Sequence, residues 1–256
     1  MTRILPIACA VFSVVAGHCG PAVAAEAAPA TGQWKFTAAI YGWIAGIDGT
    51  VAAFGTPAAD ASASMGGVLD QLEAGYMGLG EARHGRFCLA GDVYWVRLTD
   101  ERGIAMGPIA ASAEVTTESS MWTGVAGYAL VQGDTASLDA IAGARLWSVD
   151  NLLRFDSGPL EGVSARDDAT WVDPVVGVKG MAGLGSKYYV TGWALVGGFG
   201  TGSDSMWDVT GVIGYRFSDT FSVAAGYRIL SVDYRDDGFA YDIEQSGPML
   251  GAVVEF

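Results

Sequence analysis

The amino-acid sequence predicts a single all-β domain, an antiparallel up-and-down β-barrel whose strands cross a membrane. The chain is apolar on average, yet beyond its first 25 residues no apolar run approaches the roughly 18 residues of a spanning helix. Short alternating segments are separated by turn residues, and the last of them ends the chain on an aromatic residue. Apolar residues at alternate positions are typical of strands that face lipid on one side.

The first 25 residues have the features of a secretory signal peptide. Arg3 gives a positive start, residues 4–16 are apolar, and small residues precede Glu26. Cleavage after Ala24 or Ala25 fits these features, and we prefer Ala25. This predicts a signal peptide over 1–25, a short periplasmic segment over 26–33 and a barrel domain over 34–256.

Net charge and cysteine count limit the partners and sites that the chain can have. The formal net charge is -14, which argues against a nucleic-acid partner. Cys9 and Cys19 lie within the predicted signal peptide, so Cys88 is the one cysteine expected in the mature chain. A disulfide or a thiolate metal site within the chain is therefore excluded, and we expect neither a cofactor nor a metal.

Turn residues divide the mature chain into about ten strands, with eight or twelve as alternatives. The expected strands are 34–45, 72–82, 86–98, 114–131, 136–148, 170–182, 187–198, 206–216, 221–234 and 239–256. An even number returns both ends of the chain to the periplasm.

The connections between these strands alternate between two lengths. Short turns are expected at 83–86, 132–135, 183–186 and 217–220, and longer connections at 46–70, 100–112, 150–168, 200–204 and 235–238. This alternation predicts tight periplasmic turns and longer outer loops. Within the first long connection, residues 65–72 are expected to form a short amphipathic helical turn over the barrel mouth.

Residue parity separates the two faces of each strand. In segment 207–217, Trp207, Val209, Ile213, Tyr215 and Phe217 share one face, which we expect to contact lipid. The same parity places eight ionisable side chains inside the barrel: Glu81, Asp92, Asp139, Arg145, Asp173, Lys179, Arg216 and Arg228. On the lipid side an Arg or Lys would cost about 2–4 kcal/mol at the midplane. These residues are expected either to fill the lumen with ion pairs or to form a selectivity ring along a narrow pore.

The C-terminal strand resembles those of outer-membrane β-barrel proteins of Gram-negative bacteria. Residues 256, 254, 252 and 250 are all apolar, and in that class the assembly machinery reads a terminal strand ending in Phe. The resemblance implies that Phe256 is an assembly signal. It also implies a location in the outer membrane, with outer-membrane lipid, lipopolysaccharide, periplasmic chaperones and the barrel assembly machinery as partners.

An ordered set of short motifs resembles a widespread group of uncharacterised Gram-negative outer-membrane β-barrels, small porin-like proteins. The motifs are Tyr41-Gly42-Trp43, Gly46-Ile47-Asp48-Gly49, Glu81-Ala82-Arg83, Gly143-Ala144-Arg145, Trp171-Val172-Asp173-Pro174, Gly197-Gly198-Phe199-Gly200, Gly202-Ser203-Asp204 and Gly226-Tyr227-Arg228. The likeness covers nearly the whole mature chain and implies a closed barrel without known catalytic residues. It departs at Leu195-Val196, where the group's pattern has an acidic residue.

The leading function predicted from the sequence is non-enzymatic, as a narrow porin-like channel for small solutes or as a structural envelope protein. Barrel enzymes of the outer membrane that modify lipids or cut proteins use a histidine near neutral pH. The predicted mature chain has one, His84, in an expected periplasmic turn. The alternative is a surface-binding module acting through acidic outer loops, and a lipid-modifying enzyme comes third.

Overall fold

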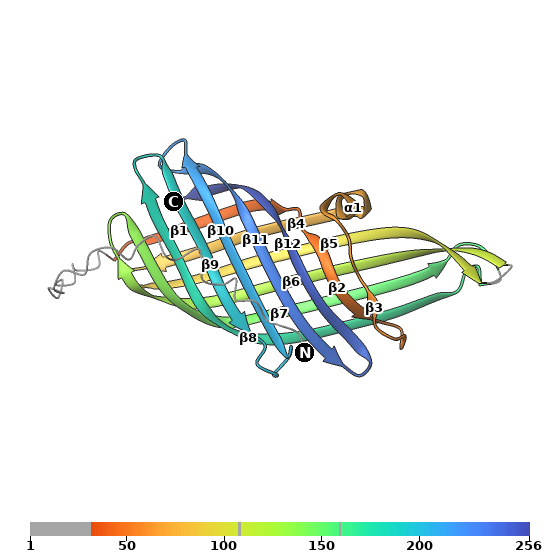
Figure 1. Cartoon of the computed structure of the whole chain (residues 1–256). Coiled ribbons are helices and arrows are strands. Elements are labelled where there is room, and N and C mark those ends of the chain that lie inside the picture. Colours follow the sequence, from red (N-terminus) through yellow and green to blue (C-terminus); the bar gives the residue numbers. More distant parts are fainter. Residues whose placement is uncertain (1–31, 107–108, 159) are drawn as a thin grey trace, which may run out of the picture. The chain divides into compact units, whose positions relative to one another are not determined.

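The computed structural model describes residues 32–106, 109–158 and 160–256. The predicted signal peptide and all but the end of segment 26–33 lie outside the described residues. The rest is almost entirely antiparallel β-structure and closes into a ten-stranded barrel, so the predicted fold class is confirmed (Figure 1). No helix among the described residues has the length and apolar character needed to cross a membrane.

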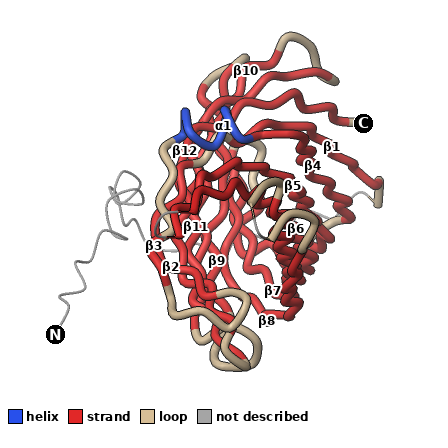
Figure 2. Tube along the Cα trace, turned by 90° about the vertical axis from the view of Figure 1, so that its right-hand side faces the viewer, coloured by secondary structure: helices blue, strands red, loops and turns tan. Residues whose placement is uncertain are grey.

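The ten barrel strands follow one another around the wall in chain order, and the first pairs with the last. They are β1 (Trp34–Trp43), β4 (Leu72–His84), β5 (Phe87–Met106), β6 (Ile109–Gln132), β7 (Ala136–Phe155), β8 (Ser164–Leu184), β9 (Tyr188–Gly197), β10 (Ser205–Arg216), β11 (Phe221–Asp236) and β12 (Phe239–Glu255). Figure 2 shows the continuous strand wall, with the helix α1 at its edge.

The connection between β1 and β4 is not simply a loop. It contains β2 (Gly46–Ala52), β3 (Ala59–Asp60) and α1 (Met65–Gln71). β2 pairs with β12 beyond the point where β1 ends, so β1 and β2 together form one interrupted edge along β12. The short helix expected from the sequence is α1, and the Ser64 side chain caps it by accepting a hydrogen bond from the Gly67 N–H at 3.2 Å.

The expected sorting of connections by length is wrong at two outer turns. β5 continues to Met106, and β6 begins at Ile109. The segment predicted as a long loop at 100–112 is therefore mostly strand. Asp237 and Gly238 alone join β11 to β12, and both have positive φ. Instead, β5, β6, β7 and β8 are 20–24 residues long, against 10 for β9, and extend beyond their neighbours (Figure 1).

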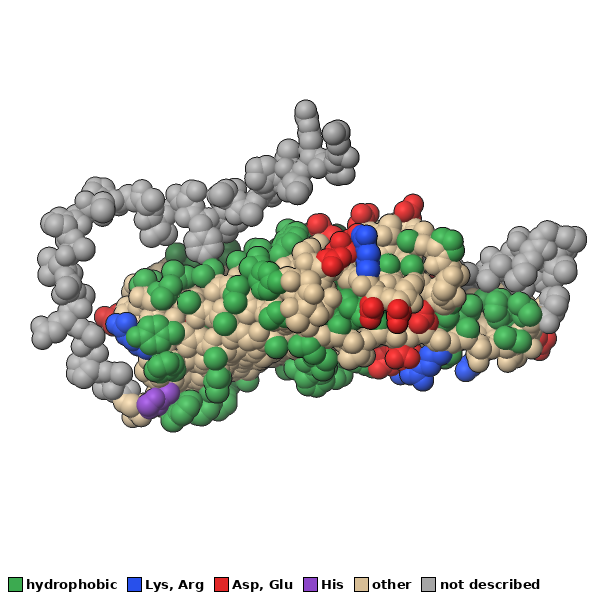
Figure 3. Space-filling model, turned by 90° about the horizontal axis from the view of Figure 1, so that it is seen from below, with side chains coloured by type: hydrophobic (Ala, Val, Ile, Leu, Met, Phe, Trp, Pro, Cys, Tyr) green, Lys and Arg blue, Asp and Glu red, His purple; other side chains and the backbone are tan. Residues whose placement is uncertain are grey.

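The outer face of the barrel carries a broad apolar belt. Exposed large apolar side chains on it include Trp34, Phe36, Ile40, Tyr76, Phe87, Leu89, Trp122, Tyr128, Leu130, Leu146, Val172, Val176, Tyr188, Val196, Trp207, Val209, Ile213, Phe217, Phe221, Tyr227, Leu250 and Val254. Charged side chains gather beyond a stretch of mainly hydrophobic surface, on the right of Figure 3. Along β5, for example, the outward series changes from Trp95 to Arg97. An exposed apolar surface this large matches a lipid environment.

Candidate functional site

The centre of the barrel interior is a network of charged side chains organised around Arg228. Arg228 projects inward from β11 and donates from Nη2 to Asp208 at 2.7 Å and to Asp92 at 3.2 Å. Its Nη1 donates to the Tyr41 hydroxyl at 3.1 Å, and that hydroxyl donates to Asp92 at 2.5 Å. Arg228 and Asp208 are 0% exposed and Asp92 is 2% exposed. One guanidinium therefore joins strands from opposite parts of the wall.

Arg145, from β7, completes this central network. Its Nη2 donates to Asp208 at 2.6 Å and its Nε to the Thr123 hydroxyl at 2.8 Å. Asp208 also accepts a hydrogen bond from the Trp193 indole at 3.2 Å. Two arginines thus share one carboxylate, and burial of all three groups requires this pairing, because an unpaired charge in the interior is very costly.

Asp173 holds the connection between β9 and β10. Its carboxylate accepts from the Ser203 N–H at 2.6 Å, from the Ser203 hydroxyl at 2.7 Å and from the Trp147 indole at 2.8 Å. The Trp171 indole in turn donates to the Ser203 hydroxyl at 2.8 Å. Ser203 is fully buried, so these contacts fasten the connection inside the barrel mouth at Ser203, whereas Phe199 on the same connection is exposed.

A second ionic cluster lies nearer the short turns. Lys179 pairs with Glu81, and Arg83 pairs with both Glu81 and Asp139. Asp139 is 1% exposed, whereas the side chains of Arg83 and Lys179 are each 17% exposed. This cluster therefore seals the lower lumen less completely than the central network seals the middle.

Above the central network the interior is aromatic. Trp171 stacks on Tyr234 with ring centroids 3.9 Å apart and planes 7° apart, and on Trp147 at 5.6 Å. Phe239 and Tyr241 complete the layer, and all five side chains are buried. The interior is thus filled by an ionic layer and, above it, by an aromatic layer.

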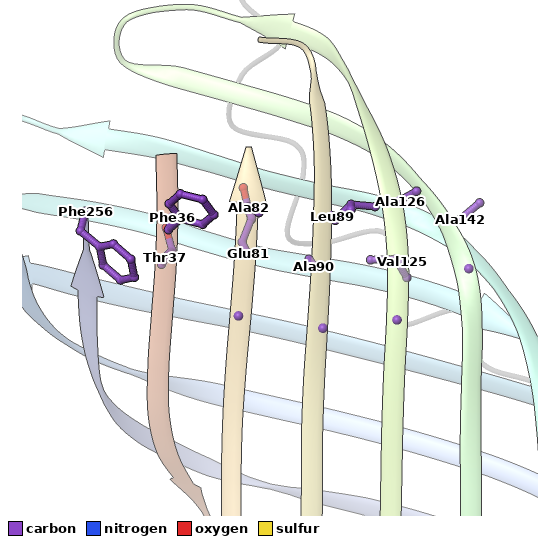
Figure 4. Close-up of a pocket in the computed structure, with 14 residues that line it drawn as sticks. Phe36, Thr37, Glu81, Ala82, Leu89, Ala90, Val125, Ala126, Ala142 and Phe256 are labelled. Atoms are coloured by element: carbon purple, nitrogen blue, oxygen red, sulfur yellow. The ribbon is translucent and has the colours of Figure 1, made fainter. Parts of the chain in front are cut away.

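The remaining two predicted residues lie elsewhere. The Arg216 guanidinium stacks on the Tyr189 ring at 4.5 Å and makes no ion pair among the described residues. Phe256 lies on the outer face beside Phe36, with ring centroids 5.7 Å apart, and the two residues exchange backbone hydrogen bonds of 2.8 and 2.9 Å. Figure 4 shows both side chains at a shallow hollow on the barrel wall. Phe256 therefore closes the seam between β1 and the end of the chain.

Seven of the eight inward charges predicted from sequence take part in these contacts. The contacts also involve residues that were not predicted as inward, among them Asp208, Arg83, Tyr41 and Ser203. Asp208 has the parity of an inward residue, so the pattern could have identified it. Arg83 was assigned to a turn, although the turn comprises only Gly85 and Arg86. Tyr41 and Ser203 lie in the quoted motifs, and only the folded chain shows what they bind. The motif set thus corresponds largely to the interior network.

The described site has few side chains suited to acid–base catalysis. The one described histidine, His84, ends β4 at a short turn, where its ring lies 5.0 Å from that of Trp34. Among the residues with described positions, no group of three or more His, Cys, Asp or Glu is arranged to hold a metal ion. Cys88 points inward and is buried.

Comparison with known proteins shows a likeness of fold. No protein-family model matches the chain, and no curated protein matches it. Among solved structures, the chain is similar to the outer membrane protease OmpT from Escherichia coli, with a TM-score of 0.55, 11% identity, and coverage of 90% of this chain and 99% of that one. It is also similar to the translocator domain of the autotransporter NalP from Neisseria meningitidis, with a TM-score of 0.45, 12% identity, and coverage of 86% and 88%. The likeness to OmpT shows that the two chains share a β-barrel fold, and an identity this low carries no activity across.

Proposed function

We propose that the chain is a closed, non-conducting barrel of the Gram-negative outer membrane, a structural envelope protein rather than a channel. The observation that carries this proposal is the complete burial of Arg145, Arg228 and Asp208 across the middle of the lumen. A conducting pore would keep such charges in contact with water, as a polar lumen does in porins. Here Arg145 and Arg228 are each paired with the carboxylate of Asp208, out of contact with water.

The aromatic layer supports the same proposal. Trp171 and Tyr234 stack directly above the ionic network, and the loop that carries Ser203 is fastened beside them by Asp173. An ion crossing the barrel would have to displace both layers and leave buried charges without partners. The outer-membrane address rests on the apolar belt, on the predicted signal peptide and on the position of Phe256 at the seam.

The protein's role would then be to anchor the long β5–β8 sheet outside the membrane. Its expected partners are outer-membrane lipid and lipopolysaccharide in the belt, and periplasmic chaperones and the assembly machinery during insertion. We propose a non-enzymatic role because His84, at the turn between β4 and β5, is at the opposite end of the barrel from the extended ends of β5–β8. OmpT is a protease, but its likeness to this chain is one of fold.

The test is solute flux through proteoliposomes. The barrel, purified from membranes after expression of the full chain, should show heat-modifiable gel migration and fractionate with the outer membrane. Liposomes containing it should swell in arabinose no faster than empty liposomes. Swelling at the rate produced by an open porin at equal protein content would refute a closed lumen.

A further inference from the structure

A polar hollow lies on the outer face of the extended sheet, just beyond the apolar belt. It has a volume of about 540 Å³, and its lining includes Glu73, Arg97, Glu114, Glu118, Asp150 and Arg166. This volume lies within the range of small-molecule sites, about 300–1,000 Å³. We propose that the hollow binds a saccharide that carries amino groups. This proposal goes beyond the closed-barrel function and does not depend on it.

Two ion pairs hold the walls of the hollow in place. Arg97 donates from Nε and Nη2 to Glu118 at 3.2 and 2.7 Å, and Arg166 donates from the same two atoms to Asp150. Each guanidinium therefore keeps its Nη1 without a hydrogen-bond partner among the described residues. These Nη1 groups are donors fixed in position by their neighbours and available to a ligand.

The acceptors in the hollow are only partly used. Glu114 makes no hydrogen bond or ion pair within the described part of the chain, and Glu73 accepts only from the Thr99 hydroxyl, at 3.2 Å. The hydroxyl oxygens of Thr99 and Thr116, which also line the hollow, lie 3.4 Å apart. Donors and acceptors thus alternate over a short distance. Sugar hydroxyls suit this pattern because each of them both donates and accepts.

The charged side chains that line the hollow limit the class of ligand that it can bind. Four carboxylates line the hollow against two guanidiniums, which disfavours a phosphate or another simple anion. Glu118 and Asp150 are each paired with an arginine, whereas Glu73 and Glu114 make no ion pair among the described residues, although Arg154 lies opposite Glu114 in the β6–β7 pair. Protonated amines on a sugar would pair with these two acids, as a neutral sugar could not.

An aromatic step borders the hollow on the membrane side. Tyr76 and Trp95 stack with ring centroids 5.3 Å apart and planes 20° apart, and Tyr76 is half exposed. The Trp95 indole donates to Glu118 at 2.9 Å, which ties this aromatic pair to the wall of the hollow. An exposed aromatic face offers an apolar platform for the C–H face of a sugar ring. The position suits either the sugar head group of a membrane glycolipid or a soluble oligosaccharide.

Calorimetric titration of the purified barrel in detergent, at slightly acidic pH, tests the proposal with three probes. These are the disaccharide of glucosamine, its N-acetylated counterpart, and putrescine, which has two amines and no hydroxyl groups. The glucosamine disaccharide should bind at least about tenfold more tightly than either of the others. Equal binding of putrescine, equal binding of the acetylated sugar, or no binding of any probe would overturn the proposal.

Matched variants assign the binding to this hollow. The double change Glu73→Gln and Glu114→Gln should weaken binding of the glucosamine disaccharide at least about tenfold. Glu244→Gln removes an exposed outward acid from β12 instead and should leave binding unchanged. All three positions are on the outer surface, and unaltered heat-modifiable migration checks folding. Loss of affinity in the control variant alone, or in neither variant, would contradict the assignment.

A second arm separates the two sources of the sugar. The same titration is made with the barrel in nanodiscs of phospholipid alone and in nanodiscs that contain lipopolysaccharide. If the hollow holds a glycolipid head group, lipopolysaccharide should lower the apparent affinity for the free disaccharide. An unchanged affinity would identify a soluble saccharide as the ligand.

Discussion

Arg228 and Asp208 form the central contact of the barrel interior, with Nη2 and Oδ2 2.7 Å apart and both side chains 0% exposed. β10 and β11 are neighbours, but the same guanidinium also reaches Asp92 on β5 across the lumen. The contact therefore joins neighbouring strands of the wall and also belongs to the network that fills the lumen. Its removal should lower the stability of the whole barrel.

Arg228→Ala should lower the free energy of unfolding by about 3–5 kcal/mol, because it leaves Asp92 and Asp208 buried with fewer partners. Urea unfolding in lipid vesicles, followed by tryptophan fluorescence, measures this change. Arg216→Ala is the matched control, since Arg216 stacks on Tyr189 without an ion pair among the described residues. Equal losses in the two variants would show that the central pairing has no special weight.

Ser203→Ala should loosen the connection between β9 and β10. The change removes the hydroxyl that joins Trp171 to Asp173, and a buried group left without its partner costs about 1–3 kcal/mol. We expect faster backbone hydrogen exchange over 198–204, with little change in β11. Ser205→Ala, at an exposed position a short distance along the chain, should leave exchange as it is. Unchanged protection in Ser203→Ala would mean that the hydroxyl contacts do not fasten the loop, since the backbone N–H of residue 203 still donates to Asp173 in this variant.

Gly143→Ala should prevent efficient folding, and Gly124→Ala should not. A Cβ at Gly143 would lie 1.9 Å from the Gly124 carbonyl oxygen, so the backbones of β6 and β7 would have to separate. A Cβ at Gly124 has nothing within 4 Å. The folded fraction after refolding, read from heat-modifiable migration, compares the two variants. A similar yield from both would mean that the close approach of these strands is dispensable.

The Arg97–Glu118 pair should give a pH-dependent signal above the membrane. Hydrogen bonds from Arg97 and Trp95 hold the pKa of Glu118 below its ordinary value. A lowered carboxyl pKa stabilises the fold above the pKa of the unfolded chain, and this stabilisation is lost as the pH falls through the folded pKa. The effect on stability should be small, since both side chains are partly exposed.

The Trp95 indole proton reports this titration directly, since it binds the Glu118 carboxylate. Its NMR shift should change with a midpoint below that of an exposed glutamate, and Arg97→Gln should raise the midpoint. A midpoint that Arg97→Gln leaves in place would show that the pair does not exist in solution.

Deletion of Phe256 should impair assembly in cells more than folding in detergent. The change removes two backbone hydrogen bonds at the seam and the contact with Phe36, but it leaves the interior network intact. We expect a lower amount of heat-modifiable barrel in the outer membrane and a near-normal refolding yield in detergent. Equal amounts of barrel in cells with and without Phe256 would argue against its role as an assembly signal.

The strands could be predicted from the sequence because lipid imposes a simple rule on their outer faces. Along β10, Trp207, Val209 and Ile213 face outward, and this alternation fixes both the strand and its orientation. Loop lengths were less predictable. The segment 100–112 begins with three charged residues and contains Gly107-Pro108, which together look like a loop, yet β5 and β6 continue there as a paired hairpin.

The partners of the interior charges could not be deduced from strand register. Arg145 lies directly opposite Asp173 in the β7–β8 pair, yet Arg145 binds Asp208 and Asp173 binds Ser203. These choices depend on the closure of the barrel and on where the β9–β10 connection folds, which are long-range properties. Sequence parity therefore predicts which charges are inside, and the folded chain decides which of them meet.

Single-channel recording tests the closed lumen most directly. The protein, purified from membranes after expression of the full chain and shown to be folded by its heat-modifiable migration, is added to a planar lipid bilayer. The account predicts a bilayer that stays silent, because the Arg228–Asp208–Arg145 network and the Trp171–Tyr234 stack block the interior. Steady openings whose ion selectivity shifts in Arg145→Ala would contradict the account and establish a pore lined by these same residues.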